Sequence, residues 1–158
     1  MEPATGLVLL GGCGSMNPKP SRQPMLKTTA ARSALMSKIR GKNTQPEMAV
    51  RRALHGLGYR FRLHVRKLPG CPDIVLRQHE TIIQVKGCFW HGHRCLKGRL
   101  PRSNRFYWVP KLRKNKARDL MNERKLRRMG WRVRTIWECK LKKMKVQELG
   151  SKLIAMLS

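Results

Sequence analysis

Three parts of the chain carry the pattern of a helix, and apolar residues recur at helical spacing in the first and the last of them. Glu47 follows Thr44 at the spacing of a capping box, and the apolar positions after it lie on one helical face as far as Leu57. A long charged segment ends at Gly130, where a glycine commonly ends a helix. The last segment places four aliphatic residues on one stripe, as expected of a helix that packs on a sheet. The predicted helices cover residues 44–57, 111–129 and 146–157.

Short runs of apolar and β-branched residues predict four strands. The first alternates apolar with basic residues, which is the pattern of a half-buried strand with a cationic outer face. The second begins at Asp73 and the third ends at Lys86, so we expect a hairpin that brings these two side chains together. The fourth strand ends at Cys139. The predicted strands cover residues 59–65, 73–76, 81–86 and 131–138.

The start of the chain differs in composition from the rest. Because it is rich in Pro, Gly, Ser and Thr, we predict a disordered leader over residues 1–30 and a single folded domain over residues 31–158. Apolar residues before Cys13 superficially suggest a lipoprotein signal, but the segment lacks a basic start and its apolar core is too short. No apolar run approaches the roughly 20 residues that span a bilayer, so we expect no membrane association.

The charge of the chain indicates a polyanionic partner. The sequence contains 36 Lys and Arg against 8 Asp and Glu, a formal net charge of +28 at pH 7. A domain this basic commonly binds nucleic acid, and a structural basic protein such as a ribosome-associated one is the alternative. Five cysteines are an odd number in a chain without an export signal, which argues against a disulfide framework and indicates a reducing cytosol.

The densest chemistry lies in the segment that follows the third strand. Cys88, His93 and Cys95 are close enough in sequence to supply three of the four ligands of a tetrahedral Zn²⁺. Cys139 is the natural fourth ligand if the strand before it lies beside the strand that leads into the loop, and Cys71 is a possible substitute. A closed set of four ligands is typical of a structural zinc site. The alternative is that these residues are buried free cysteines.

A nuclease needs a carboxylate to hold Mg²⁺ against the scissile phosphate. Among the eight acidic residues, Asp119 and Glu123 fall on the charged helix and are set aside, whereas Asp73 enters an apolar strand. Pro-Asp at this position, followed by Gln84 and Lys86, looks like a variant of the PD-(D/E)xK nuclease signature. Gln84 can coordinate a metal through its carbonyl oxygen but adds no charge. The alternative is that Asp73 only caps a turn.

From about Met36 to Leu141 the chain resembles the very short patch repair (Vsr) endonucleases. The resemblance implies an enzyme that nicks one strand beside the T of a T:G mismatch, a lesion left when 5-methylcytosine deaminates. It also implies an α/β fold like that of the type II restriction enzymes, a mixed β-sheet flanked by helices. The motifs that carry the resemblance are Ile39–Thr44, Pro46–Met48, Leu68–Gly70, Pro72–Asp73, Gly87–His93, Gly130–Val133 and Trp137–Cys139.

The resemblance implies a role for each catalytic position. Asp73 matches the aspartate that binds Mg²⁺, His91 matches a histidine that activates the attacking water, and Glu47 matches an acidic position near the site. Many relatives carry a histidine where this chain has Lys86, so we expect the site to lack a second imidazole. A lysine can stabilise charge that develops on the phosphate, and we expect activity to survive the exchange.

The resemblance further implies a structural Zn²⁺ site, contacts with DNA and partners. The zinc ligands are Cys88, His93, Cys95 and Cys139. The DNA contacts are aromatic wedges at Phe89, Trp90 and Trp108, a probe of the opposite groove at Met36, and base contacts from Lys111 and Asn115. The implied setting is a monomer in the bacterial cytoplasm, associated with the nucleoid, that cooperates with a mismatch-repair protein of the MutL type.

Two other functions fit the same residues. A related nuclease would keep the fold and act on another lesion or on a restriction-type site, to which Lys86 and Gln84 give some weight. A zinc-stabilised DNA-binding protein that has lost catalysis would keep the loop and the positive charge. Replacing Asp73 distinguishes an enzyme from a binding protein, because only an enzyme would lose nicking.

Overall fold

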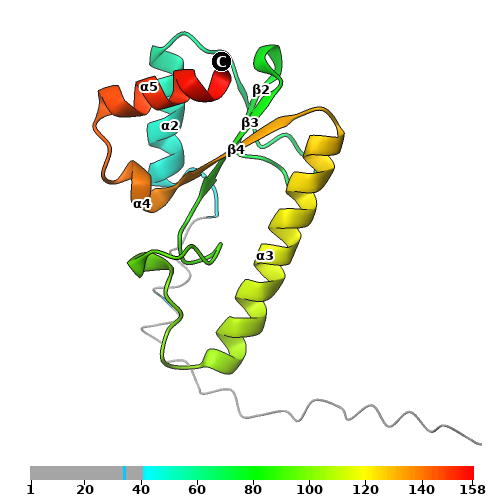
Figure 1. Cartoon of the computed structure of the whole chain (residues 1–158), viewed down its shortest axis with the longest axis vertical. Helices are drawn as coiled ribbons and strands as arrows, with labels where there is room; N and C mark the ends of the chain where they lie inside the picture. The colour runs from blue at the N-terminus through cyan, green and yellow to red at the C-terminus, as the bar shows by residue number, and fades with distance from the viewer. Residues whose placement is uncertain (1–33, 35–40) are drawn as a thin grey trace, which may run out of the picture.

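The computed structural model describes Ala34 and residues 41–158. The predicted leader over residues 1–30 and the predicted DNA contact at Met36 lie outside the described residues. Residues 41–158 form a four-stranded sheet with helices on both faces (Figure 1). In chain order the elements are α2 Gln45–Gly56, β1 Arg62–Leu63, β2 Ile74–Leu76, the 3₁₀ turn η1 Arg77–His79, β3 Thr81–Lys86, the 3₁₀ turn η2 Leu96–Gly98, α3 Arg105–Arg128, β4 Arg132–Trp137, α4 Glu138–Leu141 and α5 Val146–Leu157.

The sheet is mixed, with the strands in the order β1-β2-β3-β4. β1 and β2 are antiparallel, and β2 and β3 form the predicted antiparallel hairpin. β3 and β4 pair in parallel over their whole length, from Thr81 opposite Arg132 to Lys86 opposite Trp137. The prediction of a mixed sheet flanked by helices is therefore confirmed, while its likeness to the restriction enzymes stays a prediction.

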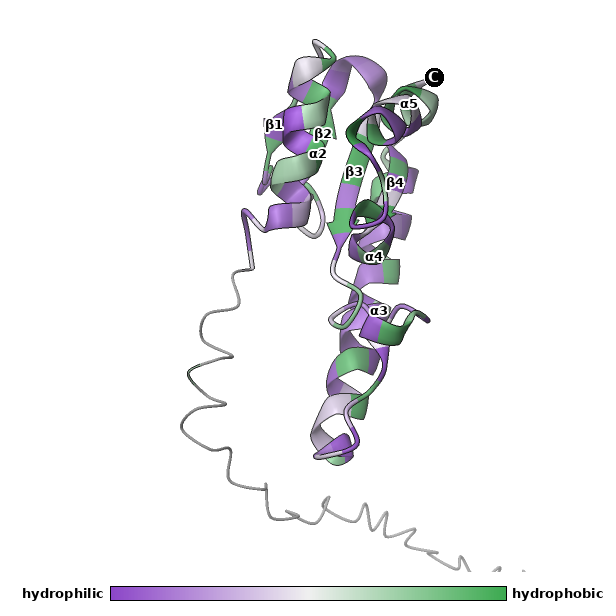
Figure 2. Cartoon of the chain, turned by 90° about the vertical axis from the view of Figure 1, so that its left-hand side faces the viewer, coloured by the Kyte–Doolittle hydropathy of each residue, from purple (hydrophilic) through white to green (hydrophobic). Residues whose placement is uncertain are grey.

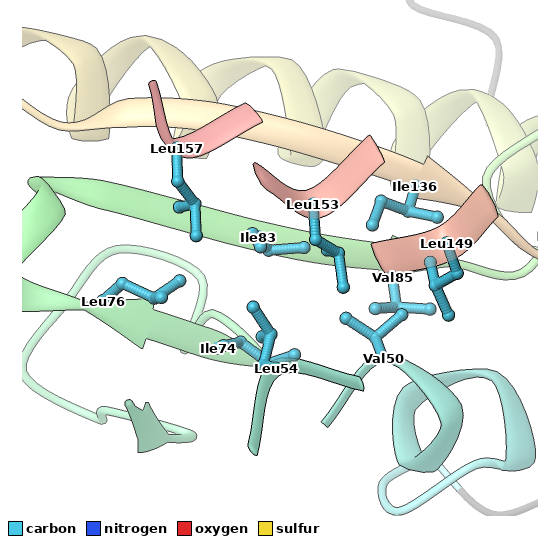
Figure 3. Close-up of a cluster of buried hydrophobic side chains, with 10 residues drawn as sticks. All are labelled: Val50, Leu54, Ile74, Leu76, Ile83, Val85, Ile136, Leu149, Leu153 and Leu157. Atoms are coloured by element: carbon cyan, nitrogen blue, oxygen red, sulfur yellow. The ribbon is translucent and has the colours of Figure 1, made fainter. Parts of the chain in front are cut away.

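Helices α2 and α5 cover one face of the sheet and enclose its larger core. Three of the four aliphatic residues of the predicted α5 stripe, Leu149, Leu153 and Leu157, pack on the strands as expected, whereas Val146 at the start of the helix is exposed. Helix α2 adds side chains from the other side of the cluster (Figure 3). Burial of one such side chain stabilises the fold by about 1.5–3 kcal/mol. The cluster consists of Val50, Leu54, Ile74, Leu76, Ile83, Val85, Ile136, Leu149, Leu153 and Leu157.

Helix α3 crosses the opposite face of the sheet. Its last turns place Leu126 on Val75, Ile82 and Val133, which form a smaller core cluster. The N-terminal half of α3 extends beyond the end of the sheet, where the segment between β3 and α3 runs alongside it (Figures 1 and 2). One end of this helix is therefore anchored in the core while the other end stands away from it.

The strand predicted over residues 59–65 is wrong in extent. Only Arg62 and Leu63 pair with β2, and both side chains are exposed. Tyr59 and Phe61 pack against the larger core from an irregular segment, so the alternation correctly marked apolar contacts without marking a strand. His64 has a left-handed φ of 46° and follows the strand directly, which ends the extended conformation at the sheet edge.

Two further elements differ from the predictions. The long helix starts at Arg105 and contains Pro110, so it begins before the charged segment that predicted it. Pro110 cannot donate a backbone hydrogen bond, so the first part of this helix has one fewer than a regular helix of the same length. The short helix α4 follows β4 immediately and was not predicted; it carries Cys139.

Within the described part of the chain, no helix is long and apolar enough to cross a membrane.

Candidate active site and metal centre

A cavity of about 780 Å³ opens where β2 begins and β3 ends, and residues of both α2 and α3 line it. Alternation along the strands explains its chemistry. Ile83 and Val85 point into the larger core, so Gln84 and Lys86 point to the opposite face. Both line the cavity together with Asp73.

Asp73 lies at the mouth of the hairpin. Extending the β2–β3 register by one residue from Ile74 opposite Ile83 places Asp73 opposite Gln84, and Lys86 lies two residues further along. The Oδ2 atom of Asp73 accepts a hydrogen bond of 2.9 Å from the backbone N–H of Val85. Burial raises the pKa of the Asp73 carboxyl, although this hydrogen bond opposes the effect. A buried carboxylate that is costly to ionise alone is a suitable ligand for a cation.

Gln84 presents an oxygen to the same cavity. Its Oε1 is buried and has no hydrogen-bond partner among the residues that the structure describes. A buried acceptor without a partner costs free energy, and a hard cation or a water bound to it would remove that cost. Carboxylate and amide carbonyl oxygens are ligands of Mg²⁺, so Asp73 and Gln84 fit this ion as a pair.

Glu47 forms part of the cavity wall but both of its oxygens are engaged. Oε2 accepts hydrogen bonds from the backbone N–H of Asn43 and from the Arg51 guanidinium, and Oε1 accepts one from the Thr44 hydroxyl. The Thr44 side chain in turn accepts from the Glu47 N–H and caps α2. The predicted cap is present, but the backbone N–H that donates to the Glu47 carboxylate is that of Asn43 instead of that of Thr44.

A second imidazole reaches the cavity, contrary to the prediction drawn from Lys86. His64 lines the cavity, and its Nε2 lies 3.0 Å from the Arg51 guanidinium. The strand pattern placed His64 on a half-buried strand and gave no sign that the chain turns there. The left-handed backbone of this residue directs it to the site from the sheet edge.

His91 faces the cavity and is held by a carboxylate that the sequence analysis set aside. Its Nδ1 pairs with Oδ2 of Asp119, in the middle of α3. Burial tends to raise the pKa of Asp119, but the hydrogen bond from His91 and the charges of His91, Lys86 and Arg118 outweigh it and lower that pKa. An ionised Asp119 fixes the proton on Nδ1 and leaves Nε2 of His91 as an acceptor.

The position of Asp119 on the inward face of α3 indicates that it has a partner inside the protein. Residues that are not exposed recur at alternating spacings of four and three, from Trp108 to Leu126, and Asp119 belongs to this stripe. Asn115, one turn earlier, donates a hydrogen bond of 3.2 Å to the carbonyl of Trp90. A polar residue between buried apolar ones at this spacing must face the protein interior, and such residues need partners.

The four predicted zinc ligands come together at the end of β3 and β4. One ligand atom from each lies within 4.8 Å of all the others. The parallel pairing of β3 with β4 brings the strand ends side by side, so α4 delivers Cys139 to the loop. His93 also stacks on Trp137, with ring centroids 4.3 Å apart. Three sulfur atoms and one imidazole nitrogen at this separation fit a tetrahedral Zn²⁺. The group consists of Cys88, His93, Cys95 and Cys139.

The thiols in this group differ in their ease of ionisation. Burial raises the pKa of Cys88 to about 12, whereas a hydrogen bond with His93 lowers the pKa of Cys95 to about 6. The backbone supports the loop as well, because the His93 N–H donates to the Cys88 carbonyl. Cys71 lines the cavity beside Asp73 and is not part of the group, so it is not the substitute ligand considered from sequence.

The aromatic residues predicted to wedge into DNA form one cluster. The Phe89 ring centroid lies 5.2 Å from that of Trp90 and 5.0 Å from that of Trp108. Phe89 and Trp90 are partly exposed, while Trp108 is only 8% exposed and supports them from α3. Lys111 is exposed on the same helix, with its amine 5.9 Å from the Tyr107 ring. Trp108 would reach a base stack only if this cluster opened.

Comparison of the sequence with known proteins identifies the family of this chain. The sequence model described as "DNA mismatch endonuclease Vsr" matches residues 26–97. The type II nicking enzyme V.XorIIP of Xanthomonas oryzae pv. oryzae is 53% identical over 110 residues, which are 70% of this chain and 81% of that protein. The chain belongs to the Vsr family. The type II nicking enzyme V.NmeAIP of Neisseria meningitidis is 45% identical over 73% of this chain and 82% of its own length. The DNA mismatch endonuclease Vsr of Escherichia coli is 37% identical over 72% of each chain.

Membership in the Vsr family makes the protein an endonuclease. The part that matches the Vsr model contains Glu47, Asp73 and His91, and it ends within η2. Asp119 and Cys139, which complete the two sites in space, lie beyond that match.

Proposed function

We propose that the protein is a Mg²⁺-dependent endonuclease that nicks one strand of duplex DNA on the 5′ side of the T in a T:G mismatch. Membership in the Vsr family and similarity to the E. coli mismatch endonuclease support this function. The observation that carries it is one cavity in which Asp73, Gln84 and the His91–Asp119 pair converge. An ion-binding oxygen pair beside a general base is the arrangement that phosphodiester hydrolysis requires.

Asp73 and Gln84 would hold the Mg²⁺ ion. The buried Oε1 of Gln84 without a partner in the described chain and the carboxylate of Asp73 face the same cavity. When bound, Mg²⁺ polarises the phosphate and lowers the pKa of a coordinated water. Glu47, whose oxygens are engaged, acts by keeping α2 and Arg51 against the cavity and by adding negative charge near Asp73.

His91 is the proposed general base. Asp119 holds the proton on Nδ1, so Nε2 can accept a proton from the attacking water. Lys86 lines the same cavity and would stabilise negative charge that develops on the phosphate oxygens. The protein thus has a lysine at the position where many relatives carry a histidine.

The cluster of Cys88, His93, Cys95 and Cys139 would bind a structural Zn²⁺. Such an ion would fix the loop that carries the aromatic residues and His91. Phe89 and Trp90, with Trp108 behind them, are the proposed wedge beside the mismatch. Lys111 and Asn115 of α3 and the N-terminal Met36 remain proposed DNA contacts; Asn115 keeps its amide oxygen available while its NH₂ group holds the loop.

A second candidate function is nicking at mismatches in another sequence context. The 53% and 45% identical relatives are named type II nicking enzymes, and Lys86 departs from the residue that many relatives carry. In either case we propose a monomer that acts on DNA in the bacterial cytoplasm, at the nucleoid, together with a MutL-type mismatch-repair protein.

The function is tested with the purified full chain and end-labelled duplexes. One duplex carries a single T:G mismatch in a CT(A/T)GG-like site, a second carries T:A, and further duplexes place T:G in other contexts. We expect a nick 5′ to the T only in mismatched duplexes and only with Mg²⁺. The context that gives the fastest nick distinguishes the two candidates.

Asp73→Ala is the matched loss-of-function variant, and Glu80→Gln removes a carboxylate from an exposed turn far from the cavity. We expect the first to bind the duplex without nicking it and the second to behave as the wild type. If the wild-type protein binds the T:G duplex without nicking it, the proposed nicking activity is wrong. If it cuts T:G and T:A duplexes equally, the proposed mismatch specificity is wrong.

A further inference from the structure

The free end of α3 exposes an apolar surface that the proposed active site does not use. Phe106 is 79% exposed, more than any other aromatic residue of the described chain, and Tyr107 beside it is 41% exposed. Leu96 and Leu100, on the segment that leads to the helix, are 73% and 41% exposed. We call these four residues and the basic residues among them the α3 tip.

The charge around the α3 tip restricts what can cover it. Between Lys97 and Arg118 the sequence contains nine basic residues and no acidic one. Arg105, the first residue of α3, and Arg102, three residues before it, are both exposed. An exposed aromatic ring surrounded by positive charges is complementary to a polyanion that also has apolar surfaces. Duplex DNA has negative charge on its phosphates and apolar surface on its stacked bases.

The position of the ring relative to the proposed wedge indicates how DNA would meet it. Trp108 packs inward on Phe89 and Trp90, and Phe106 lies two residues earlier, which is about 200° around the helix. Phe106 therefore faces away from the loop while Tyr107 connects the two sides, 5.0 Å from Trp108. The major groove is wide enough to admit an α-helix, so both sides of one helix end can contact the same duplex.

From these observations we propose that the α3 tip is a second contact with the duplex, in which Phe106 packs against bases or sugars outside the mismatched pair while Arg102 and Arg105 bind phosphates. This inference rests on the proposed function for the location of the mismatch, and it adds a surface that the predicted wedge does not include. It makes the duplex that flanks the lesion part of the recognised substrate.

The contact is tested by fluorescence anisotropy of labelled T:G and T:A duplexes without added Mg²⁺, over a series of KCl concentrations. Phe106→Ala should weaken binding by about 5- to 100-fold at every salt concentration, because a stacked or packed ring contributes in a salt-independent way. Arg105→Ala should lower the slope of log affinity against log salt by about 1, because it removes one phosphate contact. Val146→Ala, which truncates an equally exposed apolar side chain on α5, should bind as the wild type.

The location of the contact is read with 2-aminopurine, whose fluorescence changes when the stacking of its base changes: it rises on unstacking and is quenched by stacking. Probes at successive positions within one turn of the mismatch should respond at the mismatch and at one flanking site, and Phe106→Ala should lose only the flanking response. Unchanged thermal unfolding would show that this exposed substitution leaves the fold intact.

Wild-type affinity and an unchanged probe pattern in Phe106→Ala would overturn the proposal. The assay needs no nicking, so its result is separable from the proposed function. A protein that never nicks a T:G duplex can still show the Phe106 contact, and an active mismatch endonuclease can still lack it.

Discussion

Asp119 controls which nitrogen of His91 carries a proton. The carboxylate accepts from Nδ1, which leaves Nε2 of His91 as the nitrogen that would accept the proton of the attacking water in the proposed mechanism. Asp119→Asn keeps the shape of the side chain but exchanges an acceptor for an amide that can donate to Nδ1. The opposite tautomer then becomes favourable, with its proton on Nε2 and no lone pair available at that nitrogen.

The size of the effect follows from the surroundings of the pair. The His91 and Asp119 side chains are only 26% and 17% exposed, so water replaces their mutual hydrogen bond poorly. A hydrogen bond to a charged group contributes about 1.5–3 kcal/mol, and loss of general-base catalysis slows a reaction by about 10²- to 10⁴-fold. We therefore expect Asp119→Asn to raise the activation barrier by about 2.7–5.4 kcal/mol.

The assay is single-turnover nicking of a T:G duplex, with duplex affinity measured separately by anisotropy. We expect the rate of the chemical step to fall by the stated factor while affinity changes little, because the pair acts on the reacting water and not on the duplex. Glu123→Gln is the matched control: Glu123 lies one turn further along α3 and forms an ion pair of 2.8 Å with Arg127. It should nick at the wild-type rate.

Two results would refute this account of His91. Wild-type nicking by Asp119→Asn would show that the tautomer of His91 does not matter for the chemistry. Equal slowing by Asp119→Asn and Glu123→Gln would show that the charge of α3, and not the pair with His91, supports the rate.

Three further predictions concern the metal sites and their support. Because burial raises the pKa of Asp73, the folded metal-free protein retains this proton at pH values where the unfolded chain has lost it, and stability falls as the pH rises through the raised pKa. Asp73→Asn should therefore abolish nicking yet stabilise the metal-free protein above that pH, with no gain in acid; thermal melts from pH 4 to pH 8 measure this, and a destabilised variant at neutral pH would contradict it. Gly98→Ala should destabilise the protein by about 1–3 kcal/mol in denaturant titrations, because its Cβ would collide with a backbone carbonyl of the metal-binding loop, whereas Gly41→Ala meets open space and should change little. Cys139→Ser should lose bound zinc and lower the unfolding temperature, while Cys71→Ser should keep its metal; equal zinc content in both variants would refute the proposed ligand set.

Three of the four strands and the Cys/His cluster were predictable because local patterns determine them. The runs at 74–76 and 81–86 are almost entirely buried, so continuous apolar sequence marks them directly. Cys88, His93 and Cys95 share one short loop, and Cys139 needed only the assumption that its strand lies beside the one entering the loop, which the β3–β4 pairing confirms.

Other features depended on contacts that no local pattern contains. Phe61 is apolar in an alternating segment yet packs on the core without strand pairing. Asp119 stands among basic residues on a helix whose outward charges mask its inward stripe, so its partner His91, 28 residues earlier, is visible only in space. Trp108 was assigned to DNA from its chemistry, but the folded chain uses it first to support Phe89 and Trp90.

The parallel pairing of β3 and β4 also orders events during synthesis. A ribosome releases Cys88, His93 and Cys95 almost together, but Cys139 follows Cys95 by 44 residues, on the order of 2–9 s at usual elongation rates. All of α3 must emerge and β4 must join the sheet before the fourth ligand arrives. If the cluster binds Zn²⁺ as proposed, an ion at the loop would until then have three protein ligands and could exchange with its surroundings, so loading of the site would be completed only after β4 has joined the sheet.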